Sequence, residues 1–293
     1  MTGVQTCALP ISHYVRFSLS GLKKIHLGDR EKQIQFFAKS NLSNYIQYKH
    51  RQYWSGYVKA SYHWGAYRRL EYMLRHLDNY YMRHYKDLDI TVNQLFSCSF
   101  TDREQRLLIS HPIKLRLWVT GSVSYTQRYY DRSFTEFDSD IVTTTLKVSK
   151  KFRDFGTISL EGVFGIADNI TFGKGAKSSD LDRSYRHTEL YLPLSYDQGM
   201  LGFEVVGFSL RTDFRQYEVE DIGDPLHSGR SHRETKFDIW GEKNVKENLM
   251  ISCTIRFRNR FTDSNYDWVS ELKSFDQIHA WISIEWKMLY DRY

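Results

Sequence analysis

The chain has 293 residues, of which 41% are hydrophobic and 26% are charged, with only 4 prolines. This composition excludes a disordered or collagen-like chain. The sequence also contains no run of about 18 apolar residues, so it predicts no membrane-spanning helix. The net charge of +6 arises from 41 Lys+Arg against 35 Asp+Glu spread along the chain, whereas a nucleic-acid interface gathers its excess on one face. We therefore expect no nucleic-acid partner. The cysteines Cys7, Cys98 and Cys253 have no metal-ligand spacing and form no disulfide framework.

The first eleven residues, MTGVQTCALPI, have neither a periodic pattern nor the basic start and apolar core of a signal peptide. They resemble the conceptual translation of a sequencing-library adapter, codon for codon if GTG is read as a start. We interpret residues 1–11 as an adapter-derived artefact, the alternative being a genuine polar tail. Residues 12–293 are then expected to be one domain and an N-terminally truncated fragment.

Residues 12–112 carry an interrupted period of two. Apolar residues alternate over 15–19 and over 58–64, and again over 90–100 with a break at Gln94. The stretch 70–81 also fits a helical stripe, because Leu70, Met73, Leu74 and Leu77 recur at helical spacing. The parity of its neighbours favours a strand.

From residue 113 onward the period of two dominates, as a strand between two unlike environments requires. The eight clearest strands fall within 113–290. The alternating runs are expected at 113–125, as a single strand, and then at 142–148, 158–166, 188–196, 201–205, 249–257 and 278–290. Pro193 lies inside one run and removes a backbone donor, so it predicts a bulge.

The connections between these runs alternate in length. Short ones are expected at 151–156, 197–200 and 242–247, and long polar ones at 129–138, 168–184, 217–232 and 261–275. Short turns at one end and long loops at the other are typical of transmembrane β-barrels.

These patterns resemble the outer-membrane β-barrel proteins of Gram-negative bacteria, closely over 113–293 and loosely over 12–112. The most specific element is the terminal run IHAWISIEWKMLYDRY, which looks like the signal that the barrel-assembly machinery reads. Asp291 and Arg292 follow Tyr290, whereas such proteins usually end on Phe within the strand. The resemblance implies an all-β, antiparallel up-and-down transmembrane barrel with about 12–14 strands in this piece. It also implies location in the bacterial outer membrane, with membrane lipid and the assembly machinery as partners.

Charged residues that alternate with apolar ones are expected to face a wet lumen, where solvation and pairing offset the cost of desolvation. The lumen-facing candidates are Lys114, Arg116, Lys147, Glu161, Glu189, Lys236, Asp238, Arg256, Arg258, Glu285 and Lys287. On the opposite side, Trp286 and Tyr290 are expected near the short turns, and Tyr125, Phe214 and Phe261 near the long loops, as interfacial girdles.

The sequence offers no motif for catalysis or for a cofactor: GxxxxGK[ST], GxGxxG, HExxH, GxSxG and paired CxxC are all absent. Asp180 and Asp182 form at most a weak calcium site, and His227 and His232 lack a third ligand for a soft metal. We expect no enzyme activity, no cofactor and no metal. An outer-membrane phospholipase or protease would need a Ser/His or Asp/His constellation at one rim.

The function that we expect is passage or binding of polar solutes through the barrel. Two alternatives stay open: a surface-assembly or adhesion barrel that acts through its long loops, and a soluble all-β carbohydrate-binding module. Because Cys98 and Cys253 are in register with apolar neighbours, both thiols are expected to point into lipid and to remain free.

Overall fold

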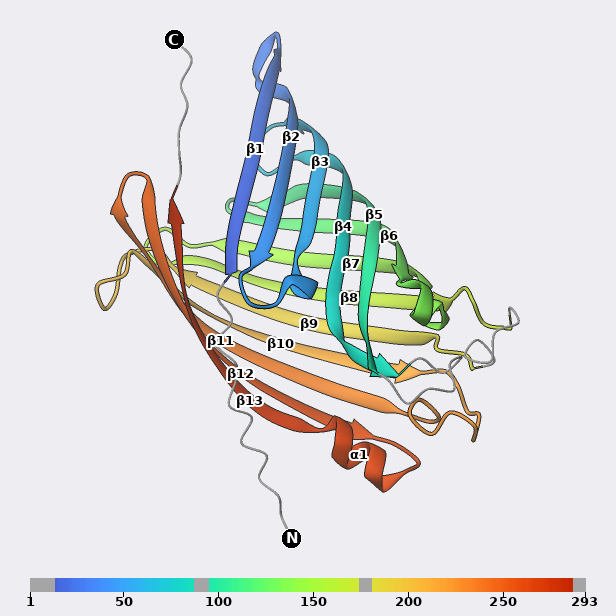
Figure 1. The fold of residues 1–293 in the computed structure, drawn as a ribbon. Coiled ribbons are helices and arrows are strands. Elements are labelled where there is room, and N and C mark those ends of the chain that lie inside the picture. Colours follow the sequence, from blue (N-terminus) through green and yellow to red (C-terminus); the bar gives the residue numbers. More distant parts are fainter. Residues whose placement is uncertain (1–13, 87–94, 174–180, 287–293) are drawn as a thin grey trace.

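The computed structural model describes residues 14–86, 95–173 and 181–286, which form a single antiparallel sheet of thirteen strands (Figure 1). Each strand pairs with its neighbours in the sequence. The strands are β1 (Tyr14–Leu27), β2 (Asp29–Tyr45), β3 (Tyr53–Trp64), β4 (Arg69–Lys86), β5 (Leu95–Lys114), β6 (Leu117–Tyr130), β7 (Ser139–Lys151), β8 (Gly156–Asn169), β9 (Tyr185–Tyr196), β10 (Val205–Tyr217), β11 (Ser231–Lys246), β12 (Leu249–Asp263) and β13 (Phe275–Trp286). The predicted all-β, up-and-down fold and its strand number are confirmed. The interpretation of residues 1–11 lies outside the described residues.

Three short helices lie in the described parts of the connections: 3₁₀ helices over Lys49–Arg51 and Arg132–Phe137, and α1 over Asp267–Lys273. Within the described parts of the chain, no helix has the length and apolar character needed to cross a membrane.

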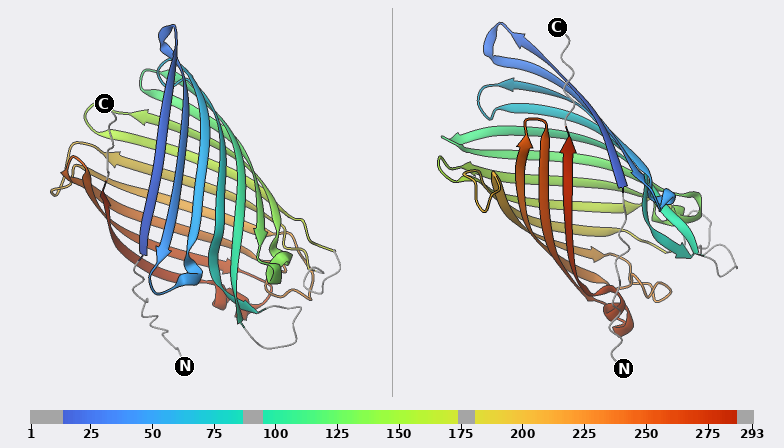
Figure 2. Two further views of the ribbon diagram at one scale, coloured as in Figure 1. Left: turned by 45° about the horizontal axis from the view of Figure 1, so that its top comes forward. Right: turned by 60° about the vertical axis from the view of Figure 1, so that its left-hand side comes forward.

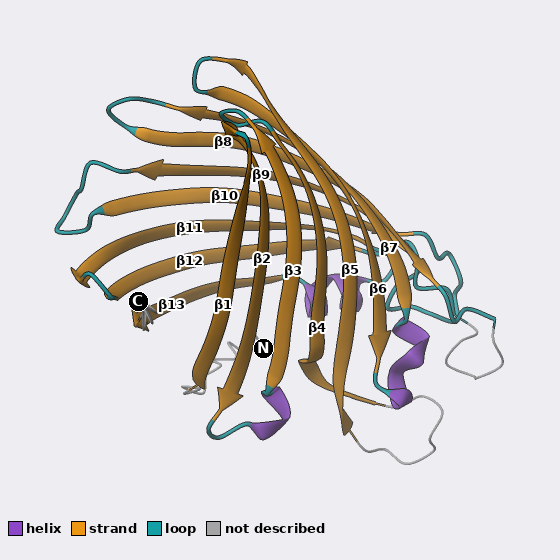
Figure 3. Ribbon diagram, turned by 90° about the horizontal axis from the view of Figure 1, so that it is seen from above, coloured by secondary structure: helices purple, strands orange, loops and turns teal. Residues whose placement is uncertain are grey.

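The sheet curls on itself, so that β1–β5 lie across from β9–β13 (Figures 1 and 3). Figure 2 shows from two further sides that the strands follow one another without a break. Among the described residues no ladder joins β1 to β13, and the curled sheet is therefore open along that seam.

The connections separate into two kinds, one at each rim. The odd-numbered strands end in connections of one to four residues at 28, 65–68, 115–116, 152–155 and 247–248, and in a segment at 197–204 that contains a tight turn. The even-numbered strands from β6 onward end in longer ones at 131–138, 170–184, 218–230 and 264–274. This confirms the predicted alternation, and it defines a short-turn rim and a long-loop rim.

The two faces of the sheet differ sharply in chemistry. One face carries Leu190, Phe208 and Ile284, and the Ile284 side chain is 70% exposed. The other face carries Ser149 and Glu234, which are buried although no second layer covers the sheet. Burial without a covering layer is possible only inside the curl, so the charged face is concave and the apolar face is convex.

Two expected strand boundaries are wrong. The run 113–125 is not one strand, because β5 ends at Lys114 and β6 begins at Leu117. Arg116 occupies the turn with a positive φ of 59°, a conformation that glycine or asparagine usually signals. The run that we expected to start at Leu201 begins only at Val205, because Met200 and Phe203 close a tight turn.

Two ambiguous segments are resolved. The stretch 70–81 lies in β4, as parity predicted and against the helical reading. Pro193 does not cause a bulge: it stands opposite Ser209 in the β9–β10 ladder, and β8 keeps its register with β9 on both sides of it. The missing amide therefore interrupts a ladder without shifting it.

The expected orientation of Cys98 is wrong. Its side chain is only 2% exposed and shares a face with Phe100, which packs against Tyr130 and the guanidinium of Arg128 on the concave side. Apolar residues near the long-loop rim thus pack inward as well as outward. Cys253 lies on the convex face with Ile251 and Ile255, as predicted, and neither cysteine forms a disulfide among the described residues.

At the long-loop rim, a buried carboxyl couples folding to pH. Burial raises the pKa of Asp138 to about 6, even though the Tyr130 amide donates a hydrogen bond to its Oδ1 at 2.7 Å. The folded state therefore binds a proton that the unfolded state releases between about pH 4 and 6, so that stability falls as the pH rises through this window.

We predict that Asp138→Asn, which keeps the acceptor oxygen, stabilises the protein at pH 7.5 by about 1 to 3 kcal/mol and flattens the slope between pH 4 and 6. Urea-induced unfolding measured across this range tests it. Asp154→Asn, an exposed substitution in a short turn, controls for the loss of one negative charge. Parallel pH profiles for native protein and Asp138→Asn would contradict the assignment.

Candidate functional site

The concave face carries a buried carboxylate that is surrounded by cations. Glu234 accepts hydrogen bonds from Arg258 Nε at 2.7 Å and from Arg260 Nε at 2.8 Å, and Lys236 Nζ lies 2.9 Å from its Oε1. We call these four residues the Glu234 cluster. The Glu234 side chain is 4% exposed, whereas the side chains of its three partners are each about a quarter exposed. One negative charge thus holds three positive ones.

The ladder between β11 and β12 creates this cluster. Glu234 stands opposite Arg260, and Lys236 stands opposite Arg258. Because side chains two residues apart project from the same face of a strand, all four reach the concave side. Directly opposed residues in an antiparallel pair lie close enough for their side chains to interact, so the register itself brings the charges together.

Further ion pairs extend from the cluster across the concave face. Asp238 receives a two-pronged hydrogen bond from Arg256, with both distances at 2.7 Å. Longer pairs of 3.5 Å join Arg211 to Glu189 and Lys147 to Glu161. The geometry of the Asp238–Arg256 pair is the strong, planar type, while the longer pairs are loosely held.

The opposite wall of the curl repeats this chemistry. Asp102 receives two hydrogen bonds from Arg128, at 2.8 and 2.9 Å. The buried Glu71 has Lys59 at 3.5 Å, Arg106 at 3.9 Å and Arg69 at 4.0 Å. A second buried carboxylate therefore also sits among three cations, so the interior is lined by charge on both sides.

Cations outnumber anions on the concave face. The residues that the register places there with positive charge are Arg16, Lys24, Lys39, Lys59, Arg69, Arg75, Arg106, Arg128, Lys147, Lys151, Arg211, Arg215, Lys236, Arg256, Arg258 and Arg260. Those with negative charge are Glu71, Asp102, Glu104, Glu161, Glu189, Asp213, Glu234, Asp238, Glu242 and Glu285. Such a surface attracts anions.

The structure places the predicted lumen-facing residues in different positions. The structure brings seven of them together in the ion pairs described above: Lys147, Glu161, Glu189, Lys236, Asp238, Arg256 and Arg258. Glu285 faces the same side, opposite Met250. Lys114 ends β5 and Arg116 lies in the turn, so neither belongs to the lined interior. Lys287 lies outside the described residues.

The residues at the centre of the site were missed. Glu234 lies two residues before Lys236, the first candidate on its strand, and Arg260 lies two residues after Arg258. Arg211 lies beyond the run expected at 201–205. Continuing the period of two from Lys236 back to Glu234, and from Arg258 on to Arg260, would have found the cluster. No sequence signal identifies which cation pairs with which carboxylate, because that depends on register.

The long-loop rim holds the nearest arrangement to an acid–base pair. His227 Nδ1 lies 2.7 Å from Asp224 Oδ2, and burial lowers the pKa of the His227 ring although Asp224 opposes the shift. Tyr217 packs 4.9 Å from the ring, and Arg230 stacks on the same tyrosine. A nearly buried imidazole packed in this way has no approach for a substrate, so we interpret the pair as structural.

Metal ligands do not converge in the described residues, which contain no group of three or more His, Cys, Asp or Glu able to hold an ion. Asp182 accepts hydrogen bonds from the Ser184 amide and hydroxyl, which uses its carboxylate in a local turn. Asp180 lies outside the described residues. His232 faces the concave side, 3.9 Å from Asp213.

No protein-family model matches the chain, and a search of curated proteins finds no match either.

The Glu234 cluster predicts an asymmetric response to charge removal. Glu234→Gln leaves three cations without their counter-charge and should destabilise the fold by about 1 to 3 kcal/mol, less than for a fully buried pair because the cations are partly screened. Glu161→Gln, which loses one cation partner at 3.5 Å, should cost less than about 1 kcal/mol. Equilibrium unfolding in urea measures both, and equal costs would show that Glu234 does not organise the cluster.

Proposed function

We propose that this protein is a β-barrel of the bacterial outer membrane that passes or binds polar solutes in its interior, without catalysis. The observation that carries the proposal is the segregation of the two faces, with exposed apolar side chains on the convex side and paired charges on the concave side. In hydrocarbon, backbone groups must pair within the protein, which strands achieve through their ladders.

The convex face has the features of a lipid-facing surface. Large apolar side chains are exposed on it along nearly the whole sheet, a distribution that is unfavourable in water. Tyr125, Phe214 and Phe261 lie on this face toward the long-loop rim, and Trp286 lies on it at the short-turn rim. These positions suit interfacial girdles. The proposed position of Tyr290 falls outside the described residues.

The concave face supports a preference for anionic solutes. Most of its carboxylates are already bound by arginine and lysine, and the surplus cations leave a positive interior. A wet interior of this kind attracts anions and repels cations of similar size.

Conductance across a planar bilayer tests the function. We expect discrete conductance steps and, under a salt gradient, a reversal potential that shows anions to be more permeant than cations. The double substitution Arg258→Gln with Arg260→Gln should reduce this selectivity, whereas Arg233→Gln on the convex face should leave it unchanged. Selectivity for cations would contradict the proposed solute class. Stable insertion without conductance would favour the alternative function through the long loops.

The orientation of the faces has its own test. Ile284→Arg should disfavour insertion by about 2 to 4 kcal/mol if position 284 lies near the membrane midplane, while Ser283→Arg, on the concave face, should cost much less. Reversible folding into lipid vesicles measures both. Equal penalties at 283 and 284, or a native protein that remains soluble without detergent, would contradict a lipid-facing convex surface.

A further inference from the structure

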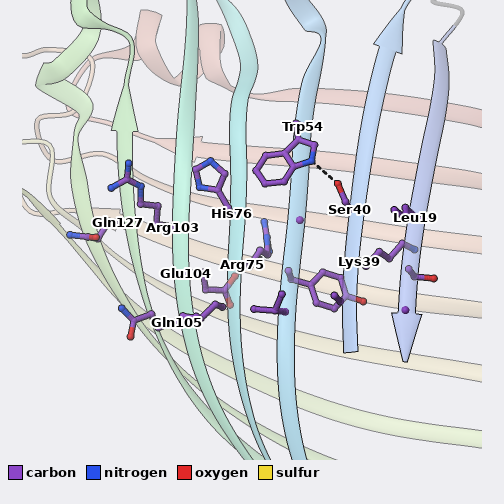
Figure 4. A pocket seen from close by; sticks show the side chains of 17 residues that line it. Leu19, Lys39, Ser40, Trp54, Arg75, His76, Arg103, Glu104, Gln105 and Gln127 are labelled. Carbon is purple, nitrogen blue, oxygen red and sulfur yellow. Dashed lines mark hydrogen bonds and ion pairs between the residues drawn. The ribbon is translucent and has the colours of Figure 1, made fainter. Parts of the chain in front are cut away.

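The convex face is not evenly covered, because a hollow of about 770 Å³ opens over β1–β6 (Figure 4). Gly21, Ala38 and Gly56 contribute to its lining without large side chains, and Leu19 and Leu74 border it. A second hollow of about 630 Å³ shares Gly21, Ala38 and Leu74 and extends toward the short-turn rim past Phe36 and Tyr72. Together they form a groove that crosses these strands, which we call the convex groove.

Glycine keeps the groove open at two positions. A Cβ atom at position 56 would lie 3.0 Å from an indole carbon of Trp54, so glycine lets this ring lie against β3. The indole N–H of Trp54 donates a hydrogen bond to Ser40 at 2.6 Å (Figure 4). At position 21 an added Cβ would meet nothing within 4 Å, so this part of the groove is open space.

The end of the groove nearer the long-loop rim is polar. One row of the ladder places Ser40, Gly56, His76, Arg103 and Gln127 on the successive strands β2 to β6 of the convex face. Arg103 is exposed, and among the described residues no carboxylate lies within salt-bridge distance of it. Its guanidinium lies 5.9 Å from the Tyr129 ring, and His76 packs against Trp54. Within the described parts of the chain, a cation with no counter-charge therefore stands at the head of an apolar groove.

We propose that the convex groove binds an anionic membrane lipid, with an acyl chain along the groove and its phosphate headgroup against Arg103 and His76. The inference rests on the proposed membrane orientation of the convex face. In hydrocarbon a groove lined by small residues is filled by a lipid chain. The guanidinium then selects among lipids, because it donates paired, charge-assisted hydrogen bonds to a phosphate. In a zwitterionic headgroup, the ammonium group offsets the negative charge of the phosphate and weakens this attraction.

Trp54 provides a local probe of occupancy. The protein and its Trp54→Phe variant are inserted into phosphatidylcholine vesicles containing a minor fraction of lipid with brominated acyl chains, either phosphatidylglycerol or phosphatidylcholine. The difference in emission between the two proteins isolates Trp54. We expect brominated phosphatidylglycerol to quench Trp54 preferentially, with an apparent affinity about tenfold above that of phosphatidylcholine.

Two variants should abolish this preference: Arg103→Ala, which removes the headgroup contact, and Gly21→Leu, which fills the groove. Two matched variants should retain it: Arg233→Ala, another arginine of the convex face, and Gly162→Leu, another convex glycine with open space around its Cβ position. Insertion of each variant is checked by its resistance to protease in the vesicles.

Equal quenching of Trp54 by the two lipids would overturn the lipid site while leaving the proposed function intact. Displacement of phosphatidylglycerol by inorganic phosphate would also overturn it, because the groove would then contribute nothing to binding. Absence of quenching by either lipid, together with failure to insert, would instead contradict the proposed function itself.

Discussion

The antiparallel ladder between successive strands is the constraint on which the rest of the structure depends. It fixes which residues oppose one another, and the pleat of each strand then sends alternate side chains to opposite faces. The Glu234 cluster, the charged concave face and the polar row that contains Arg103 are all consequences of register. A shift of β12 by one residue relative to β11 would move Arg256, Arg258 and Arg260 onto the apolar face and leave Glu234 without its arginine partners.

Much of this architecture could be predicted from the sequence, because the period of two is strong where the two faces differ most. From Leu117 to Trp286 the apolar residues of the runs lie on the convex face almost throughout, and the long connections fall within a few residues of their expected places. The ambiguous stretch in β4 was resolved by parity, since an up-and-down sheet requires a strand there.

The rest could not be read from the sequence for identifiable physical reasons. The turn at Arg116 uses a positive φ without glycine, asparagine or aspartate, so nothing in the residues signals it. Cys98 and Phe100 are apolar but face inward, because the interior near the long-loop rim has a small apolar region of its own. The partners of Glu234 depend on register, and a convex groove depends on small residues from three different strands.

The odd number of described strands has a consequence for the sidedness of the molecule. β1 and β13 run in the same direction, so the described chain enters the sheet at Tyr14 on the long-loop rim and leaves it at Trp286 on the short-turn rim. A direct seam between them would be a parallel ladder with slanted, evenly spaced hydrogen bonds, unlike every other ladder in the sheet. In a membrane, tags attached next to residues 14 and 286 would therefore lie in different aqueous compartments.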